Sequence, residues 1–290
     1  MVDSNNEVTK NMIAFRNRIY VGSAGRKSVF DACIRADDEA VVVFVHGYKG
    51  FKDWGAWNLV EKNFLDRGFG FVKFNMSHNG GTVANPIDFS DLEAFAQNRY
   101  SWEVADLNTI VAETQKLIKS HFQTEKPIYV TGHSRGGGIA VLAGCRNKEI
   151  SKIISLAGIC DIGSRFPIGE NLLLWEQEGV MYAENARTKQ QMPHNFSMYE
   201  DYLDNQDDLS IEKAAGKLSA PFLQIHGDMD TSVSISEGIK LAEWTNSELA
   251  IVKGADHTFG AQEPWIYDVL PEDLKEAINR TLAFLKSDIA

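Results

Sequence analysis

The stretch VTGHSRGGG, residues 130–138, places a histidine and a serine among four glycines, directly after a run of apolar residues. Such a stretch can be a phosphate-binding loop, an ordinary tight turn between a strand and a helix, or a turn that exposes a nucleophilic serine. Residues 132–136 read GHSRG and fit the pattern G-x-S-x-G. Glycine at both ends of this pattern allows close backbone approach at a sharp turn, where side chains would clash. The rest of the chain decides between the three interpretations, because each one requires different partners.

Apolar runs alternate with helical patterns on both sides of this stretch. The run AVVVFVHG (residues 40–47) is continuously apolar, which is typical of a strand buried on both faces. Further strands are predicted at 69–75, 127–132, 152–158, 221–227 and 248–254, after a hairpin near 18–34, and helices at 57–67, 104–118, 134–146, 237–245 and 272–286. This alternation predicts an α/β fold with a mostly parallel central sheet and helices on both faces.

One segment interrupts the alternation. Residues 163–217 contain no apolar run of the buried-strand type, but they include several aromatic side chains. We therefore expect a cap (lid) insertion at 163–217, lying over the edge of a core domain that is formed by residues 1–162 and 218–290. Within the insertion, residues 180–193 are expected to form a small hairpin.

A serine hydroxyl is a weak nucleophile at neutral pH, so it needs a general base and an acid that orients the base. His257 follows the last predicted strand and is the candidate base for Ser134. The motif HGDMD, residues 226–230, supplies Asp228 and Asp230 after an earlier strand. The order serine, acid, histidine along the chain is the one that accompanies a G-x-S-x-G turn of this kind.

Acyl transfer also requires backbone N–H donors for the negative oxygen of the tetrahedral intermediate. One donor normally belongs to the residue after the nucleophile, which is Arg135 here. The second is expected in the loop after an early buried strand. The stretch FVHGYKG, residues 44–50, offers the N–H of Tyr48 at that place.

The combined motifs resemble those of α/β-hydrolase-fold serine hydrolases over nearly the whole chain. They are HGY (46–48), GHSRG (132–136), HGDMD (226–230) and DH (256–257). Within this fold the chain is most similar to the bacterial dienelactone-hydrolase-like and prolyl-oligopeptidase-like group. In that group the acid lies three residues past the glycine of the H-G-x-x-D turn, so the resemblance selects Asp230. Dienelactone hydrolases proper carry cysteine as the nucleophile, and Ser134 therefore argues against dienelactone as the substrate.

Aromatic residues predict a substrate pocket near the nucleophile. Trp54 and Trp57 follow the loop of Tyr48, and Trp175 and Tyr182 lie in the expected cap, so together they would form an apolar acyl or aryl pocket. A substrate-facing position is also considered for His78, which follows a predicted strand. For the other histidines we expect His133 to pack away from the site, His46 and His226 to satisfy loop backbone, and His121 and His194 to lie on the surface.

Composition and charge exclude several classes of protein. The formal net charge of -11 argues against a nucleic-acid partner, because such proteins present basic faces. Seven scattered histidines and three widely spaced cysteines fit neither metal-ligand spacing nor a disulfide framework, so we expect no metal and no cofactor. The polar first fifteen residues and the lack of a long apolar run predict neither a signal peptide nor a membrane span. We expect a soluble, cytoplasmic protein.

The leading functional prediction is hydrolysis of a carboxylic ester in a small-molecule acyl substrate. The same side chains cleave small peptides and thioesters, so these reactions remain alternatives. The chain shows no large extra domain of the kind that restricts substrate entry in prolyl-oligopeptidase relatives, which favours small esters. A non-catalytic ligand receptor with the same fold is a further alternative. No oligomeric state is implied by the sequence.

Overall fold

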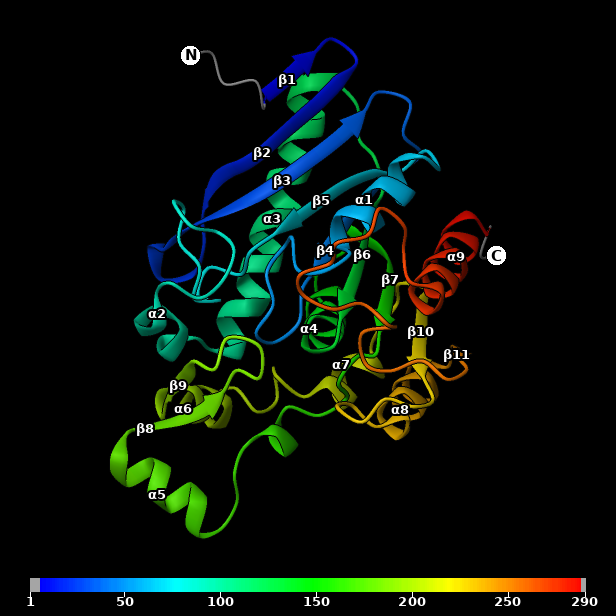
Figure 1. Ribbon diagram of the computed structural model, residues 1–290. Coiled ribbons are helices and arrows are strands. Elements are labelled where there is room, and N and C mark those ends of the chain that lie inside the picture. Colours follow the sequence, from blue (N-terminus) through cyan, green and yellow to red (C-terminus); the bar gives the residue numbers. More distant parts are fainter. Residues whose placement is uncertain (1–5, 288–290) are drawn as a thin grey trace.

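Nine strands form one mixed sheet in the computed structural model, which describes residues 6–287 (Figure 1). Residues 1–5, part of the polar amino-terminal stretch considered above, and residues 288–290 lie outside the described part. The strand order is β1-β2-β3-β5-β4-β6-β7-β10-β11. Their bounds are β1 Asn6–Thr9, β2 Met12–Val21, β3 Lys27–Arg35, β4 Val41–Val45, β5 Gly70–Phe74, β6 Ile128–His133, β7 Ile150–Leu156, β10 Phe222–Gly227 and β11 Glu248–Val252. From β5 to β11 neighbouring strands are parallel, whereas β1, β2 and β3 pair antiparallel, so the predicted mostly parallel sheet is confirmed.

Strand β4 shows why these apolar runs become central strands. Val41, Val43 and Val45 pack into one hydrophobic core, and Val42 and Phe44 pack into a second core on the other face. All five side chains are almost fully buried. Alternate residues of a strand point to opposite faces, so only a run that is apolar throughout can serve both cores.

Helices cover both faces of the sheet (Figure 1). The first core includes residues of α3 (Tyr100–Phe122), α4 (Arg135–Gly144) and α8 (Ile235–Thr245). The second core includes residues of α1 (Trp57–Leu65) and α9 (Glu272–Lys286). The short helix α2 (Leu92–Gln97) and the 3₁₀ turn η1 (Ser23–Gly25) lie outside these layers. The predicted helices on both faces are thus confirmed.

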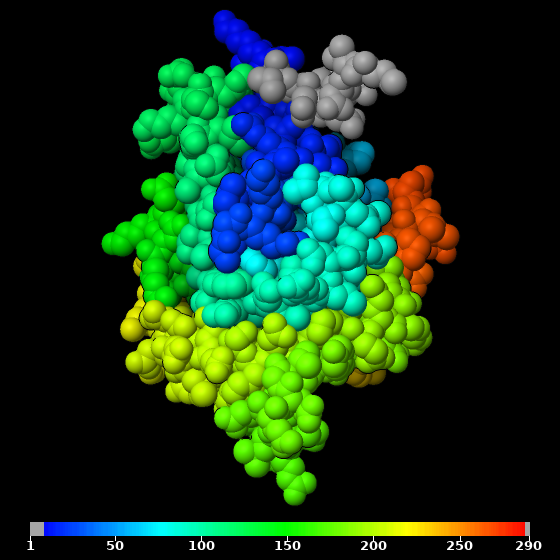
Figure 2. All heavy atoms as spheres, turned by 90° about the vertical axis from the view of Figure 1, so that its left-hand side faces the viewer, coloured from blue at the N-terminus to red at the C-terminus, as the bar shows by residue number. Residues whose placement is uncertain are grey.

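The segment 163–217 lies between β7 and β10, which are neighbours in the sheet. It contains η2 (Gly163–Arg165), α5 (Glu170–Glu178), β8 (Val180–Glu184), β9 (Gln191–Asn195), α6 (Ser197–Asp204) and α7 (Ile211–Ala215). Strands β8 and β9 pair antiparallel in a separate two-stranded sheet, so the predicted hairpin is confirmed. Helix α5 projects from the body of the molecule, as the protrusion at the bottom of Figure 2 shows.

The loops that follow β4, β6, β10 and β11 carry the residues singled out by the sequence. Tyr48 follows β4, Ser134 follows β6, Asp230 follows β10 and His257 follows β11. Because these four strands are parallel, their carboxyl ends lie at one edge of the sheet, which is where ligands bind in open α/β sheets.

Candidate active site

Ser134 occupies the sharp turn between β6 and α4, with φ 56° and ψ −120°. A non-glycine residue at such positive φ is strained, and the surrounding structure must hold it there. A Cβ atom on Gly132 would lie 2.1 Å from the carbonyl oxygen of Gly136, and one on Gly136 would lie 2.3 Å from the carbonyl oxygen of Val45. Both glycines are therefore required by close backbone contact, as the sequence pattern predicts.

A chain of two hydrogen bonds leads away from Ser134. The Nε2 atom of His257 lies 2.9 Å from Ser134 Oγ, and its Nδ1 atom lies 2.7 Å from Asp230 Oδ2. An ionised carboxylate can only accept, so Nδ1 donates to Asp230 and Nε2 is left to accept from the Ser134 hydroxyl. The geometry matches that in which a serine, a histidine and a carboxylate can activate the serine hydroxyl.

Asp230 is held in the ionised form. Burial opposes ionisation, but hydrogen bonds from His226, His257 and the N–H of Val233 hold the pKa of Asp230 well below its usual range. Its Oδ1 accepts from the backbone N–H groups of Ser232 (2.8 Å) and Val233 (2.9 Å), which fixes the orientation of the carboxylate. The orienting group is thus itself anchored by the turn after β10.

The second aspartate of the HGDMD motif has a different partner. Asp228 Oδ1 accepts a hydrogen bond of 2.6 Å from the N–H of Gly254. It links the loops after β10 and β11 without reaching the imidazole. The structure therefore brings Asp230, and not Asp228, to His257.

The two candidate oxyanion donors lie on either side of Ser134. A Cβ atom on Gly47 would lie 3.0 Å from Ser134 Cβ, which shows how closely the loop of Tyr48 approaches the nucleophile. Within residues 6–287 the N–H of Tyr48 has no acceptor. Arg135 is the first residue of α4, where an N–H has no partner inside the helix. Both N–H groups are therefore available to an oxygen atom of a substrate.

Comparison with known proteins identifies the family of the chain. Residues 36–210, more than half of the chain, match the model of the family described as serine aminopeptidase, S33. The chain belongs to this family of α/β hydrolases. No curated protein matches the sequence significantly.

Solved structures show the same fold as this hydrolase. Est1E from Butyrivibrio proteoclasticus, solved with ferulic acid bound, is 18% identical with a TM-score of 0.67, and the match covers 92% of this chain and 98% of that one. A dienelactone hydrolase from Anabaena variabilis is 17% identical with a TM-score of 0.60, and the match covers 95% of this chain and 97% of that one. At these identities the likeness establishes the fold, and the predicted α/β-hydrolase resemblance is confirmed.

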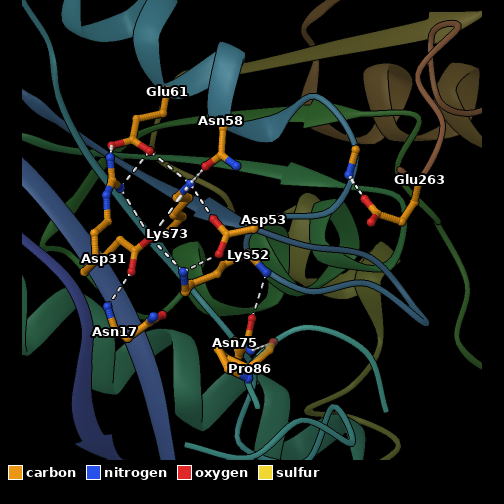
Figure 3. A network of polar contacts seen from close by, with 12 residues as sticks. Asn17, Asp31, Lys52, Asp53, Asn58, Glu61, Lys73, Asn75, Pro86 and Glu263 are labelled. Carbon is orange, nitrogen blue, oxygen red and sulfur yellow. Dashed lines mark hydrogen bonds and ion pairs between the residues drawn. The ribbon is translucent and has the colours of Figure 1, made fainter. Parts of the chain in front are cut away.

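A largely buried group of charged side chains joins the loop after β4 to β2, β3, β5 and α1 (Figure 3). We call it the ionic network, and it consists of Arg16, Asp31, Lys52, Asp53, Glu61 and Lys73. Lys52 Nζ contacts Asp31 Oδ2 at 2.7 Å and Asp53 Oδ2 at 2.5 Å, while Lys73 Nζ contacts Asp53 Oδ1 at 2.7 Å and Glu61 Oε2 at 2.9 Å. Three cations thus balance three carboxylates. Because Lys52 and Asp53 belong to the loop after β4, the network fixes the loop against β3, β5 and α1.

Two pockets open on Ser134 and His257. The first, which we call the arginine pocket, has a volume of about 450 Å³ and is lined by residues that include Tyr48, Tyr100, Arg135, Arg165, Phe166 and His194. The second, the tryptophan pocket, has a volume of about 520 Å³ and is lined by residues that include Trp54, Trp57, Lys49, Glu184, Arg187 and Glu263. The two differ in chemistry, since the tryptophan pocket contains charges of both signs.

Three residues of the predicted substrate pocket line neither of these two pockets, which corrects the predicted pocket. His78 is 3% exposed, packs on Trp102 and bonds to Ser77. Trp175 is 2% exposed, because its ring packs into the first core and its Nε1 donates to the carbonyl of His194. Tyr182 is 62% exposed on β8, whose neighbouring residues face the site instead.

His194 is the site residue that the sequence interpretation missed. The prediction of a surface position is wrong, because β9 lies against the loop of Tyr48 and only 4% of His194 is exposed. Its Nε2 lies 2.6 Å from the Tyr48 hydroxyl, which joins the segment 163–217 to the loop of Tyr48. Burial, with Arg135 and Lys49 nearby, lowers the pKa of His194 to about 3, so the ring is neutral. No sequence motif marks this residue, because its partner lies 146 positions away.

His46 and His226 bond to loop backbone as predicted, whereas the prediction that His133 packs away from the site is wrong, because it lines the tryptophan pocket and its ring centre lies 4.9 Å from that of His257. His46 Nδ1 donates to the carbonyl of Gly47 and its Nε2 accepts from the N–H of Met76, while His226 Nε2 bonds to the carbonyl of Val233. His133 is buried, and its Nε2 lies 2.9 Å from the carbonyl oxygen of His257. His121 is half-buried and contacts the carbonyl of Thr9.

Two general features concern metals and membranes. Within residues 6–287, no three His, Cys, Asp or Glu side chains are grouped so that they could hold a metal ion. In the same part of the chain, no helix combines the length and apolar character needed to cross a bilayer.

Proposed function

We propose that this hydrolase cleaves a carboxylic ester through an acyl-enzyme intermediate on Ser134. The observation that carries the proposal is the hydrogen-bonded chain from Ser134 Oγ through His257 to Asp230, with lengths of 2.9 and 2.7 Å. Its strained position on the turn exposes the Ser134 hydroxyl to both pockets. The family match and the fold support hydrolysis, and the triad supports a serine mechanism.

The reaction follows from the positions of these atoms. Ser134 Oγ attacks the carbonyl carbon while its proton passes to Nε2 of His257, and the resulting oxyanion accepts from the N–H groups of Tyr48 and Arg135. When the C–O bond to the alcohol breaks, Nε2 returns the proton to the leaving oxygen and the acyl group stays on Ser134. Water then attacks the acyl carbon while Nε2 takes one of its protons, and when the bond from the acyl carbon to Ser134 Oγ breaks, Nε2 returns this proton to Oγ, so that the carboxylic acid leaves and the free serine is restored.

We further propose that residues 163–217 act as a cap (lid) over this site, on a core formed by residues 1–162 and 218–290. Residues of the segment line both pockets, and His194 bonds to the Tyr48 hydroxyl. A cap that excludes water would strengthen the electrostatic interactions at the oxyanion.

The family description favours one alternative, cleavage of small peptides from the amino terminus. An aminopeptidase must hold the positive ammonium group next to the scissile bond. The residues lining the arginine pocket include two arginines and no carboxylate, which would repel that group, and in the tryptophan pocket Glu184 and Glu263 are balanced by Lys49 and Arg187. Ester cleavage is therefore the better-supported activity, and a thioester would be cleaved by the same steps.

The decisive experiment replaces the nucleophile. We expect wild type to hydrolyse short-chain nitrophenyl esters and to react with a fluorophosphonate probe, and Ser134→Ala to lose at least about 10⁴-fold in kcat/KM. Ser236→Ala, which removes an exposed hydroxyl on α8, is the matched control and should keep both properties.

Full labelling of Ser134→Ala by the probe would refute the assignment of the nucleophile. Labelling of wild type without turnover of any ester, thioester or peptide would instead favour a ligand receptor.

A further inference from the structure

The arginine pocket has an unusual charge for this protein. The chain carries a formal net charge of -11, yet the pocket lining contains Arg135 and Arg165 and no aspartate or glutamate. The acidic partners of both arginines lie behind them. Glu103 pairs with Arg135 at 3.0 Å, and Glu237 pairs with Arg165, but neither carboxylate lines the pocket. Carboxylates outside the pocket thus orient the two guanidinium groups, and the arginines themselves line the cavity.

Arg135 is rigidly held. Its guanidinium carbon lies 4.4 Å from the ring centre of Tyr48 and 4.6 Å from that of Tyr100, so the plane is stacked between two aromatic rings. Nη1 donates to Glu103, whereas Nε and Nη2 have no acceptor within residues 6–287. A guanidinium stacked in this way offers its free edge as a planar pair of donors, which matches a carboxylate.

Two further polar groups around the pocket lack partners. Tyr100 is 1% exposed, and its hydroxyl has no hydrogen-bond partner in the described part of the chain. Burial raises the pKa of Tyr100, although Arg135 opposes the shift, so the hydroxyl keeps its proton and can donate. Nδ1 of His194 also lacks a partner, but it is fully buried and does not face the cavity. The Tyr100 hydroxyl and the free edge of Arg135 are therefore the unpartnered donors of this pocket, and polar groups of this kind, set side by side without partners, point to a ligand.

We propose that the arginine pocket binds a carboxylate on the acyl part of the substrate, so that the preferred substrates are half-esters of short dicarboxylic acids. The free edge of Arg135, the unpaired Nη1 of Arg165 and the Tyr100 hydroxyl hold the carboxylate. Phe166, Met181 and Met198 contact the methylene chain that leads to Ser134. This inference rests on the proposed ester hydrolysis at Ser134, but it concerns a separate property, the charge of the acyl group.

The first test compares two esters of equal shape. Monomethyl glutarate carries a terminal carboxylate, and methyl glutaramate carries the uncharged amide in its place. We expect kcat/KM to be at least about tenfold higher for monomethyl glutarate, because charge-assisted hydrogen bonds are stronger than neutral ones. The succinate and adipate half-esters, measured with their amides, would show which chain length fits.

Variants then locate the carboxylate. Arg165→Gln and Tyr100→Phe should each reduce the preference for monomethyl glutarate over methyl glutaramate by about five- to tenfold. Arg146→Gln is the matched control, because Arg146 also pairs with a single acid, Asp208, on the surface away from the pocket, and its preference should equal that of wild type. Equal turnover of the two esters by wild type would overturn the proposal and leave ester hydrolysis intact. A preference that survives in both pocket variants would also overturn it.

A binding measurement separates this inference from the proposed reaction. Calorimetry on Ser134→Ala should show that monomethyl glutarate binds at least about tenfold more tightly than methyl glutaramate. This result would support the pocket even if no ester were hydrolysed by wild type. Equal affinities, or no binding of either ester, would overturn the carboxylate site whatever the outcome of the activity assays.

Discussion

The triad and the ionic network are both chains of hydrogen-bonded charged side chains that join segments far apart in sequence. They differ in access and in the nature of their partners. The triad opens on two pockets through Ser134, whereas Asp31, Lys52 and Lys73 of the network are each at most 2% exposed. A substrate can reach the nucleophile of the first group, whereas the centre of the second is closed and only Arg16 and Asp53 at its rim are partly exposed.

The acids in the two regions are alike, and their partners decide what they can do. Burial opposes ionisation of Asp53, but Lys73 and Lys52 lower its pKa, just as hydrogen bonds lower that of Asp230. Asp230 faces an imidazole, which can accept a proton during a reaction and return it. Asp53 faces two ammonium groups, which form fixed ion pairs. The triad is therefore suited to proton transfer and the network to holding a loop.

The largest expected effect comes from the acid of the triad. Asp230→Asn should lower kcat by about 10⁴-fold, because an amide can donate to Nδ1 and so favours the wrong tautomer of His257. Asp228→Asn is the matched control from the same motif. It retains an oxygen that can accept from Gly254, so its kcat should fall by less than about tenfold. Steady-state kinetics on one nitrophenyl ester measure both variants, and the reverse order would reassign the acid.

The next largest effect concerns folding. Lys73→Met keeps most of the side-chain volume but leaves Asp53 and Glu61 without their shared cation, and the free energy of unfolding should fall by about 3–5 kcal/mol. Lys62→Met is the control, because Lys62 forms an exposed pair with Asp66 and should change stability by less than about 1 kcal/mol. Urea denaturation measures both, and turnover per folded molecule should change far less than in Asp230→Asn.

A double variant tests whether charge, rather than packing, explains that loss. Adding Glu61→Gln to Lys73→Met removes one unbalanced carboxylate and should recover part of the stability. Additive losses in the double variant would show that the network acts through packing alone.

The same contrast explains what could be predicted from the sequence. Ser134, the HGDMD motif and His257 each follow a recognisable apolar strand, and parallel strands bring their carboxyl ends together, so local patterns predict all three at one edge. The choice of Asp230 over Asp228 comes from the family resemblance and not from the local pattern. The ionic network depends on antiparallel register, which sets Asp31 opposite Lys73 on β3 and β5. From the sequence, charged residues in such strands would be predicted to be exposed. In the structure, the loop that carries Lys52 covers them.

The substrate pocket was predictable only in part. Trp54 and Trp57 follow the HGY motif at residues 46–48, which predicts a position near Ser134, and they line the tryptophan pocket. In the segment 163–217 the pairing of β8 and β9 decides which side chains face Ser134. The number of aromatic residues in the segment does not predict which ones these are. Trp175 therefore fills the core, while His194, without any local signal, bonds to Tyr48.

The smallest expected effect concerns His46, which lies between the two regions at the end of β4. Burial lowers the pKa of His46 to about 4, against 6.5 for the free side chain, so only the unfolded chain takes up a proton between these values. Stability from the neutral ring is complete above pH 6.5 and is lost as pH falls, by up to about 1.4 kcal/mol per pH unit. His133 and His194 add similar losses, because burial lowers the pKa of each to about 3. We therefore expect the unfolding free energy of His46→Gln to fall less steeply than that of wild type between pH 6.5 and pH 5. The difference between the two losses should be about 2 kcal/mol at most over this range. Parallel curves for the two proteins would show that His46 is protonated in the folded state as well, and that the hydrogen bond from Met76 to its Nε2 does not persist in solution.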